Sequence, residues 1–193
     1  MISRDDTNPQ ASNIIDEMPY MLAFYEASLE QSAHSAVDAF FAYGRAIDGG
    51  QSEIIIARHL HDAMTHCAAI SRFFWPPAKP ESLAARRGAA LRKQYGVSDH
   101  SPLANRELRN ALEHFDERLD SWILSGPVGP IMASPIVAAH SIVDDGFGHA
   151  FKVIDIENDI YVILGKKFPF GELAKEVSRL LIGGDETMLQ EGA

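Results

Sequence analysis

Apolar side chains recur at steps of three and four residues through the first 124 positions, and this period constrains the fold more than any other feature. One helix is predicted from about Asp16 to Ile47, and Asp48-Gly49-Gly50 ends it. A second is predicted from the N-cap residue Ser52 to about Phe74. Each helix carries one apolar stripe to bury, so the two are expected to pack together as antiparallel neighbours. The stripes comprise Leu22, Tyr25, Leu29, Ala33, Ala36 and Phe40 on the first helix and Ile56, Leu60, Ala63, Cys67, Ile70 and Phe74 on the second.

A proline-rich break from Trp75 to Pro80 separates these helices from two more. The first of these is short and basic, from about Ser82 to Tyr95. The next is predicted from about Pro102 to Leu124. Its buried stripe consists of Leu108, Leu112, Phe115, Leu119 and Trp122.

The pattern changes to a β period after a loop rich in glycine and proline at 126–135. Turn residues separate three predicted strands, which fit a small antiparallel hairpin or meander. The strands are Val137–Val143, Phe147–Ile156 and Ile160–Leu164. A last helix is predicted from about Gly171 to Ile182, buried through Leu173, Val177 and Leu180, with Gly183-Gly184 as its end.

Together these elements predict a mainly α fold. It is an up-and-down helical bundle with a small C-terminal antiparallel β hairpin or meander and a final helix. A single domain is expected over residues 16–182, with the bundle at 16–124 and the β appendage and last helix at 137–182. Residues 1–15 and 184–193 are expected to be flexible tails.

The composition favours a cytoplasmic protein. No apolar run approaches the roughly 20 residues that span a bilayer, so no membrane association is expected. The N-terminus lacks the basic start and apolar segment of a secretory signal. The single cysteine, Cys67, excludes an internal disulfide and falls in an apolar stripe, where it is expected to be a buried small hydrophobe.

The charge is unevenly distributed along the chain. The net charge of −10 argues against broad nucleic-acid binding, because phosphates attract Lys and Arg. Residues 72–109, however, carry eight basic and three acidic residues, between two strongly acidic flanks. This basic island is either a solvated helix face or an RNA-binding surface. Its candidate RNA-binding residues are Arg86, Arg87, Arg92 and Lys93.

The most specific local pattern is Arg109-Asn110-Ala111-Leu112-Glu113-His114, at the end of the basic island. At helical spacing, Asn110 and His114 lie one turn apart on a face away from the buried stripe. Arg109 lies nearer the core, where it can pair with Glu113 four residues on. An ordinary polar helix face carrying that pair is the structural alternative to a catalytic site.

This pattern resembles the R-N-x-x-x-H motif of the HEPN superfamily, and the helical context over 16–124 is similar too. The resemblance implies a homodimer whose two motifs face a shared cleft, acting as a metal-independent endoribonuclease. It implies that His114 moves a proton at the ribose 2′-hydroxyl or the leaving oxygen. Arg109 neutralises charge on the phosphate, and Asn110 orients His114. Many members of the superfamily have no known cleavage activity, and Glu113, Asp116, Glu117 and Asp120 crowd the same helix.

Two further clusters each have a structural and a functional interpretation. His59, Asp62 and His66 share one face of the second helix, as a polar surface, a metal site or part of the same cleft as His114. No bound metal and no cofactor is expected, because no third histidine completes that face. Phe73-Phe74-Trp75 fits an aromatic cap on the core better than a platform for stacking bases. The remaining histidines, which include His61, His100, His140 and His149, look scattered.

Three functional hypotheses follow. The first is a HEPN-like homodimer that binds and cleaves RNA. The second is a non-catalytic interaction protein in which the same bundle dimerises or binds a partner protein, such as an antitoxin-like regulator. The third, a metal-dependent helical-bundle protein using His59, Asp62 and His66, has the least support.

Overall fold

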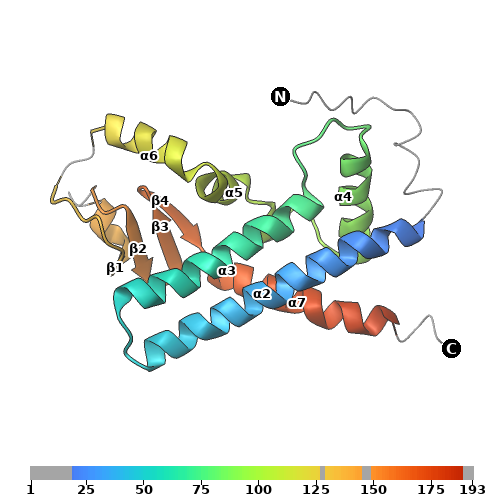
Figure 1. Ribbon diagram of the computed structural model, residues 1–193, viewed down its shortest axis with the longest axis horizontal. Helices are drawn as coiled ribbons and strands as arrows, with labels where there is room; N and C mark the ends of the chain where they lie inside the picture. The colour runs from blue at the N-terminus through green and yellow to red at the C-terminus, as the bar shows by residue number, and fades with distance from the viewer. Residues whose placement is uncertain (1–18, 127–128, 145–148, 189–193) are drawn as a thin grey trace.

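Two long antiparallel helices form the backbone of the fold (Figure 1). The structure is a computed structural model that describes residues 19–126, 129–144 and 149–188. A short 3-10 segment, η1 (Pro19–Met21), leads into α2 (Leu22–Asp48), and α3 (Glu53–Phe74) returns along it. The glycine turn between them closes with the Gly50 N–H donating to the Ile47 carbonyl, and Gly50 takes the positive φ of 60° that favours glycine. Both predicted helices are therefore confirmed, except that residues 19–21 are a 3-10 segment and the predicted start at Asp16 lies outside the described residues.

Small residues let α2 and α3 pack closely. Ala33 and Ala36 of α2 and Ala63 of α3 are fully buried. Larger side chains such as Leu29 and Leu60 fill the space on either side. The same core continues into one face of the sheet and the last helix, whereas Ala150, Val153 and Val162 form a second, smaller cluster.

The short basic helix α4 (Leu83–Gln94) crosses the end of α3. It begins where predicted, because the Ser82 hydroxyl accepts a hydrogen bond from the Ala85 N–H at 3.2 Å. Its close approach to α3 depends on Gly88. A Cβ at that position would lie 2.6 Å from the Phe74 carbonyl oxygen and 2.9 Å from Pro76 Cδ.

The predicted helix 102–124 is not continuous, and this prediction was wrong. The structure has a 3-10 turn η2 (Pro102–Ala104), then α5 (Arg106–Glu113) and α6 (Phe115–Leu124). The helix breaks at His114, whose φ of −115° and ψ of 42° are not helical. The two halves pack against different layers. Leu108 and Ala111 of α5 are buried in the bundle core, whereas α6 lies over the sheet, with Phe115 against Phe151 (Figure 1).

The sheet has four short strands in the order β1-β2-β3-β4. They are β1 (Ile136–Val137), β2 (Lys152–Asp155), β3 (Ile160–Ile163) and β4 (Lys166–Pro169). The last three form an antiparallel meander, of which the β2–β3 hairpin is the predicted part, and β1 pairs parallel with β2 rather than antiparallel. Strand β4 was not predicted, because only Phe168 of its residues is buried and its two lysines are exposed.

The predicted strand 137–143 was mostly wrong, since η3 (His140–Val143) is a 3-10 turn. The predicted strand 147–156 is shorter at its start, and residues 145–148 lie outside the described residues.

The final helix α7 (Gly171–Met188) packs across α2 through its buried residues Leu173, Val177 and Leu180. It continues past Gly183-Gly184, so the predicted end there was wrong. Glycine disfavours a helix interior by only about 1 kcal/mol, which an established helix can absorb. The predicted tails are only partly described, because residues 1–18 and 189–193 lie outside the described residues and 184–188 are helical.

Candidate functional site

Three arginines converge on the C-terminal end of α3. Arg109 Nη1 donates to the Trp75 carbonyl oxygen at 2.9 Å. The Arg92 guanidinium donates to the carbonyl of Phe74, and Arg87 Nη2 donates to the carbonyl of Arg72 at 3.2 Å. The last carbonyls of a helix have no partner within the helix, and the negative end of its dipole favours cations. These arginines therefore stabilise the end of α3 and hold α4 and α5 against it.

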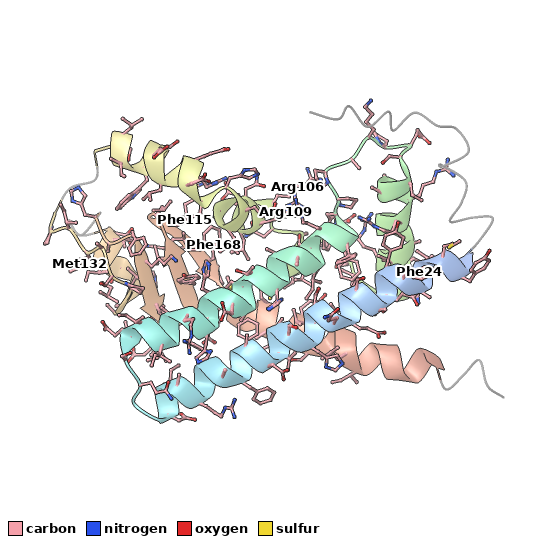
Figure 2. All side chains as sticks on the ribbon, viewed as in Figure 1. Phe24, Arg106, Arg109, Phe115, Met132 and Phe168 are labelled. Carbon is pink, nitrogen blue, oxygen red and sulfur yellow. The ribbon has the colours of Figure 1, made fainter. Side chains whose placement is uncertain are left out.

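Arg109 is the most deeply placed of the three. It is only 5% exposed, and Figure 2 shows it between α5 and the end of α3. The predicted ion pair between Arg109 and Glu113 does not form, because Glu113 pairs instead with Arg72 at 3.1 Å. The helical period predicts the face on which Arg109 lies. It does not predict that Arg109 will donate to a carbonyl at the end of another helix.

The four predicted RNA-binding residues of the basic island do not all face solvent, because two of them make these contacts with α3. Arg87 lies over the Tyr25 ring at 4.9 Å, and Arg92 over the Trp75 ring at 5.5 Å, so both are part of the packing around α3. Arg86 lies 3.7 Å from Glu81, and Lys93 is exposed. The structure therefore does not present these four residues as one free cationic surface.

The other two motif residues lie at the surface where α5 meets α6. The His114 side chain is 56% exposed and its Nδ1 lies 3.8 Å from Glu117. Two backbone bonds cross the break, from His114 N–H to the Asn110 carbonyl and from Arg118 N–H to the His114 carbonyl. They keep Asn110, His114 and Arg118 one turn apart along one edge of α5 and α6. Within the described part of the chain, the Asn110 amide has no hydrogen-bond partner.

A small cationic pocket of about 180 Å³ adjoins this edge through Arg118, while Asn110 and His114 lie outside its lining. Arg118 and Ser121 of α6 and Lys166 of β4 supply its polar groups, and Trp122 forms part of its wall. Lys166 Nζ lies 3.2 Å from Glu107, whereas no carboxylate of the described residues pairs with Arg118. The sequence showed Arg118, but not that an unpredicted strand brings Lys166 beside it.

The carboxylates that crowd this stretch are separated by the helix geometry. Asp116 and Asp120 share a row with Ile123, on the opposite flank of α6 from Arg118. Glu113 is paired with Arg72, so Glu117 is the carboxylate in contact with His114. The pocket edge therefore has a more positive environment than the sequence alone indicated.

The histidine cluster of α3 forms a partly covered helix face. His59 and His66 are half-buried and Asp62 is exposed. In the part of the chain that the structure describes, no group of three His, Cys, Asp or Glu side chains is arranged to hold a metal ion. Between them His61 packs edge-on against Tyr161, and burial, with Lys152 nearby, lowers the pKa of His61.

Two predictions about the core are confirmed. Cys67 is buried in α3, and burial raises the pKa of its thiol to about 12, which is typical of an inert cysteine rather than a nucleophile. Phe74 is fully buried, with Trp75 and Tyr95 edge-on to its ring, so this aromatic cluster caps the core.

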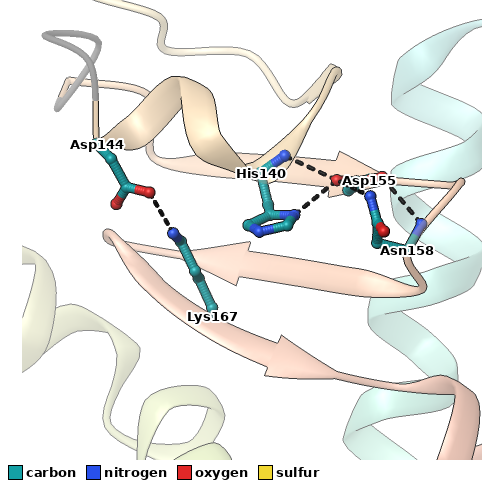
Figure 3. Close-up of polar contacts among 5 residues, drawn as sticks. All are labelled: His140, Asp144, Asp155, Asn158 and Lys167. Atoms are coloured by element: carbon teal, nitrogen blue, oxygen red, sulfur yellow. Dashed lines mark hydrogen bonds and ion pairs between the residues drawn. The ribbon is translucent and has the colours of Figure 1, made fainter.

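A buried polar network that the sequence did not indicate ties η3 to the sheet (Figure 3). Asp155, only 3% exposed, accepts hydrogen bonds from the His140 backbone N–H at 2.9 Å and from His140 Nδ1 at 2.7 Å. It also accepts from the backbone N–H and the side-chain amide of Asn158, at 3.1 and 3.0 Å. These bonds draw residues 140–143 into a turn instead of the predicted strand. These bonds join η3 to β2 and to the turn that follows it.

Burial alone would raise the pKa of Asp155, but the bonds from His140 and Asn158 outweigh it and hold that pKa well below its usual range. We therefore expect Asp155→Asn to lower the free energy of unfolding at pH 7 by about 2–4 kcal/mol. The native carboxylate contributes stability above the unfolded pKa of about 3.9 and loses it as the pH falls.

Denaturant unfolding of both proteins at neutral and acidic pH checks this prediction. The difference between wild type and variant should shrink below about pH 4. A difference that does not change with pH would contradict the account of Asp155.

Comparison of the chain with protein-family models, with curated proteins and with solved structures gives no match. The resemblance to the HEPN superfamily therefore rests on Arg109, Asn110 and His114. Among the helices of the described residues, none has the length and apolar character needed to cross a membrane.

Proposed function

We propose that this protein is a HEPN-like homodimer that binds RNA and cleaves it without a metal ion. The observation that carries the proposal is the edge formed by Asn110, His114 and Arg118 beside the cationic pocket. It combines an exposed imidazole with an amide and a guanidinium that have no partner among the described residues, within two helical turns. These are the groups that proton transfer at a phosphodiester requires.

His114 is the acid–base group of the proposed reaction. The 2′-oxygen attacks the neighbouring phosphorus, the bond from phosphorus to the 5′-oxygen breaks, and a 2′,3′-cyclic phosphate is left. One His114 accepts the 2′-hydroxyl proton, and the other His114 of the dimer protonates the departing 5′-oxygen. Asn110, one turn away, orients the imidazole.

The cation of the proposed site is Arg118 rather than Arg109. Arg109 is buried and donates to the Trp75 carbonyl, so its role is to position α5, and with it Asn110 and His114. Arg118 and Lys166 line a pocket whose size suits a phosphate, and the Trp122 ring in its wall can stack on a base. In this assignment the phosphate charge of the transition state develops beside Arg118.

The test is cleavage of a fluorescently labelled RNA by purified wild type in the presence of a chelator. We expect His114→Ala to slow cleavage about a hundredfold or more, with an unchanged unfolding midpoint because the side chain is exposed. His100→Ala is the matched control, since His100 is also exposed and lies outside the site. Wild type that cleaves no RNA, or His114→Ala that cleaves as fast as wild type, would overturn the proposal.

The second candidate is a non-catalytic interaction protein, and the burial of Arg109 favours it. An arginine of the motif that hydrogen-bonds to the end of α3 has a structural role, as expected if the bundle serves as a binding scaffold. In that case wild type has no cleavage to lose, and His114→Ala changes only the affinity for a second copy or a partner protein. The same assay, followed by light scattering of both proteins, separates the two candidates.

A further inference from the structure

An apolar groove of about 460 Å³ lies between α6 and the chain that leads into the sheet, and Trp122 separates it from the cationic pocket. In Figure 2, Met132 marks the end of the molecule where α6 finishes. The described residues that line the groove are Leu119, Trp122, Ile123, Ile131, Met132, Ala133, His149 and Phe151. All but His149 are apolar, so the groove has the character of a docking surface rather than of an active site.

Its rim leaves large apolar side chains in water. Ile123 is 59% exposed and Ile131 82% exposed, and Leu124, which follows Ile123 in α6, is also exposed. Single exposed apolar residues are ordinary, but a contiguous group around an apolar groove marks a site of interaction.

The groove is shaped by a fixed pair of rings. The carbonyl of Gly129 accepts a hydrogen bond from His149 Nδ1 at 2.7 Å, which places the imidazole proton on that nitrogen. The His149 ring then lies edge-on to Trp122, with centroids 6.2 Å apart. The hydrogen bond and the ring contact together position His149 in the wall of the groove.

The negative charge beside the groove favours one kind of binding partner over the others. Asp116 and Asp120 lie in one row with Ile123 and form an acidic edge along it. A two-fold contact between two copies of this face would oppose these carboxylates to each other, and an RNA phosphate would be repelled by them. A partner with cationic side chains beside apolar ones is complementary to this edge.

We infer that the groove binds an amphipathic helix of a partner protein, with large apolar side chains at i, i+3 and i+7 and a row of Lys or Arg on one flank. The apolar side chains fill the groove against Trp122 and Phe151. The cations pair with Asp116 and Asp120, which fixes the direction and side on which the helix lies. This is the helix-in-groove mode of recognition, and it uses neither His114 nor Arg118, although Trp122 lines both this groove and the cationic pocket.

The probe for this inference is a synthetic helical peptide of about 18 residues, with leucines at that spacing and lysines on one flank. A second peptide has glutamates in place of the lysines, and binding is measured by fluorescence anisotropy. We expect the lysine peptide to bind wild type at least about tenfold more tightly than the glutamate peptide. Asp116→Lys combined with Asp120→Lys should reverse that preference, and both side chains are exposed, so the fold should tolerate the change.

Ile123→Asp should weaken the lysine peptide at least about tenfold, because it places a charge in the apolar groove. Phe41→Asp, a similar change at an exposed apolar residue of α2, is the matched control and should bind as wild type does. Arg118→Gln should also leave peptide binding unchanged, which separates this surface from the RNA site. Equal binding of the two peptides, or a preference that the double charge reversal does not invert, would overturn the inference.

Discussion

Gly88→Ala is expected to destabilise the protein by about 3 kcal/mol, because the new methyl group has no space. Its Cβ would lie 2.6 Å from the Phe74 carbonyl oxygen and 2.9 Å from Pro76 Cδ, and neither a backbone carbonyl nor a proline ring can move aside as a flexible side chain can. Relieving the clash pushes α4 away from α3, which also stretches the bond from Arg92 to Phe74. The measurement is the free energy of unfolding in urea.

Gly44→Ala is the matched control for this change. Gly44 also lies inside a helix, α2, but a Cβ there would meet no atom within 4 Å. Alanine favours a helix over glycine by about 1 kcal/mol, so Gly44→Ala should be neutral or stabilising. Equal effects of the two substitutions would show that α4 does not approach α3 as closely as described.

The second large effect is expected at Arg109. Replacing it with alanine removes a charged hydrogen bond, leaves the Trp75 carbonyl without its partner and opens a space where the buried side chain lay. We expect Arg109→Ala to lower the free energy of unfolding by about 3 kcal/mol. Arg109→Lys keeps a cationic donor and should lose less, whereas Arg109→Met fills the space but not the hydrogen bond and should lie between the two.

Denaturant unfolding of the three variants gives this order directly. If Arg109→Ala is as stable as wild type, the guanidinium is not needed at the end of α3. Its catalytic assignment from the HEPN resemblance would then stand again.

The helices were predictable because their signals are local. Gly49-Gly50, Ser52, Ser82 and the prolines after Trp75 mark the ends of α2, α3 and α4 within a residue or two. The break at His114 was not predictable in this way. Both α5 and α6 have a regular helical pattern, and the break comes from the two layers on which they pack.

The roles of individual polar residues depended on contacts between distant segments. Asp155 lay within a predicted strand, and nothing nearby in the sequence indicated that His140 would bond to it through both its backbone and its ring. The roles of Arg109 and Lys166 could not be predicted from the sequence for the same reason. A helix end far along the chain uses the guanidinium of Arg109, and an unpredicted strand places Lys166 in the pocket of Arg118.

The central claim is that His114 acts on RNA with Arg118 as the cation, while Arg109 holds the fold. RNA cleavage rates of Arg109→Lys and Arg118→Gln, each compared with wild type at a temperature where all three are folded, test it most directly. The account predicts that Arg109→Lys cleaves within a few-fold of wild type and that Arg118→Gln is slower by about tenfold to a hundredfold. The reverse order, or wild type without cleavage, would contradict it.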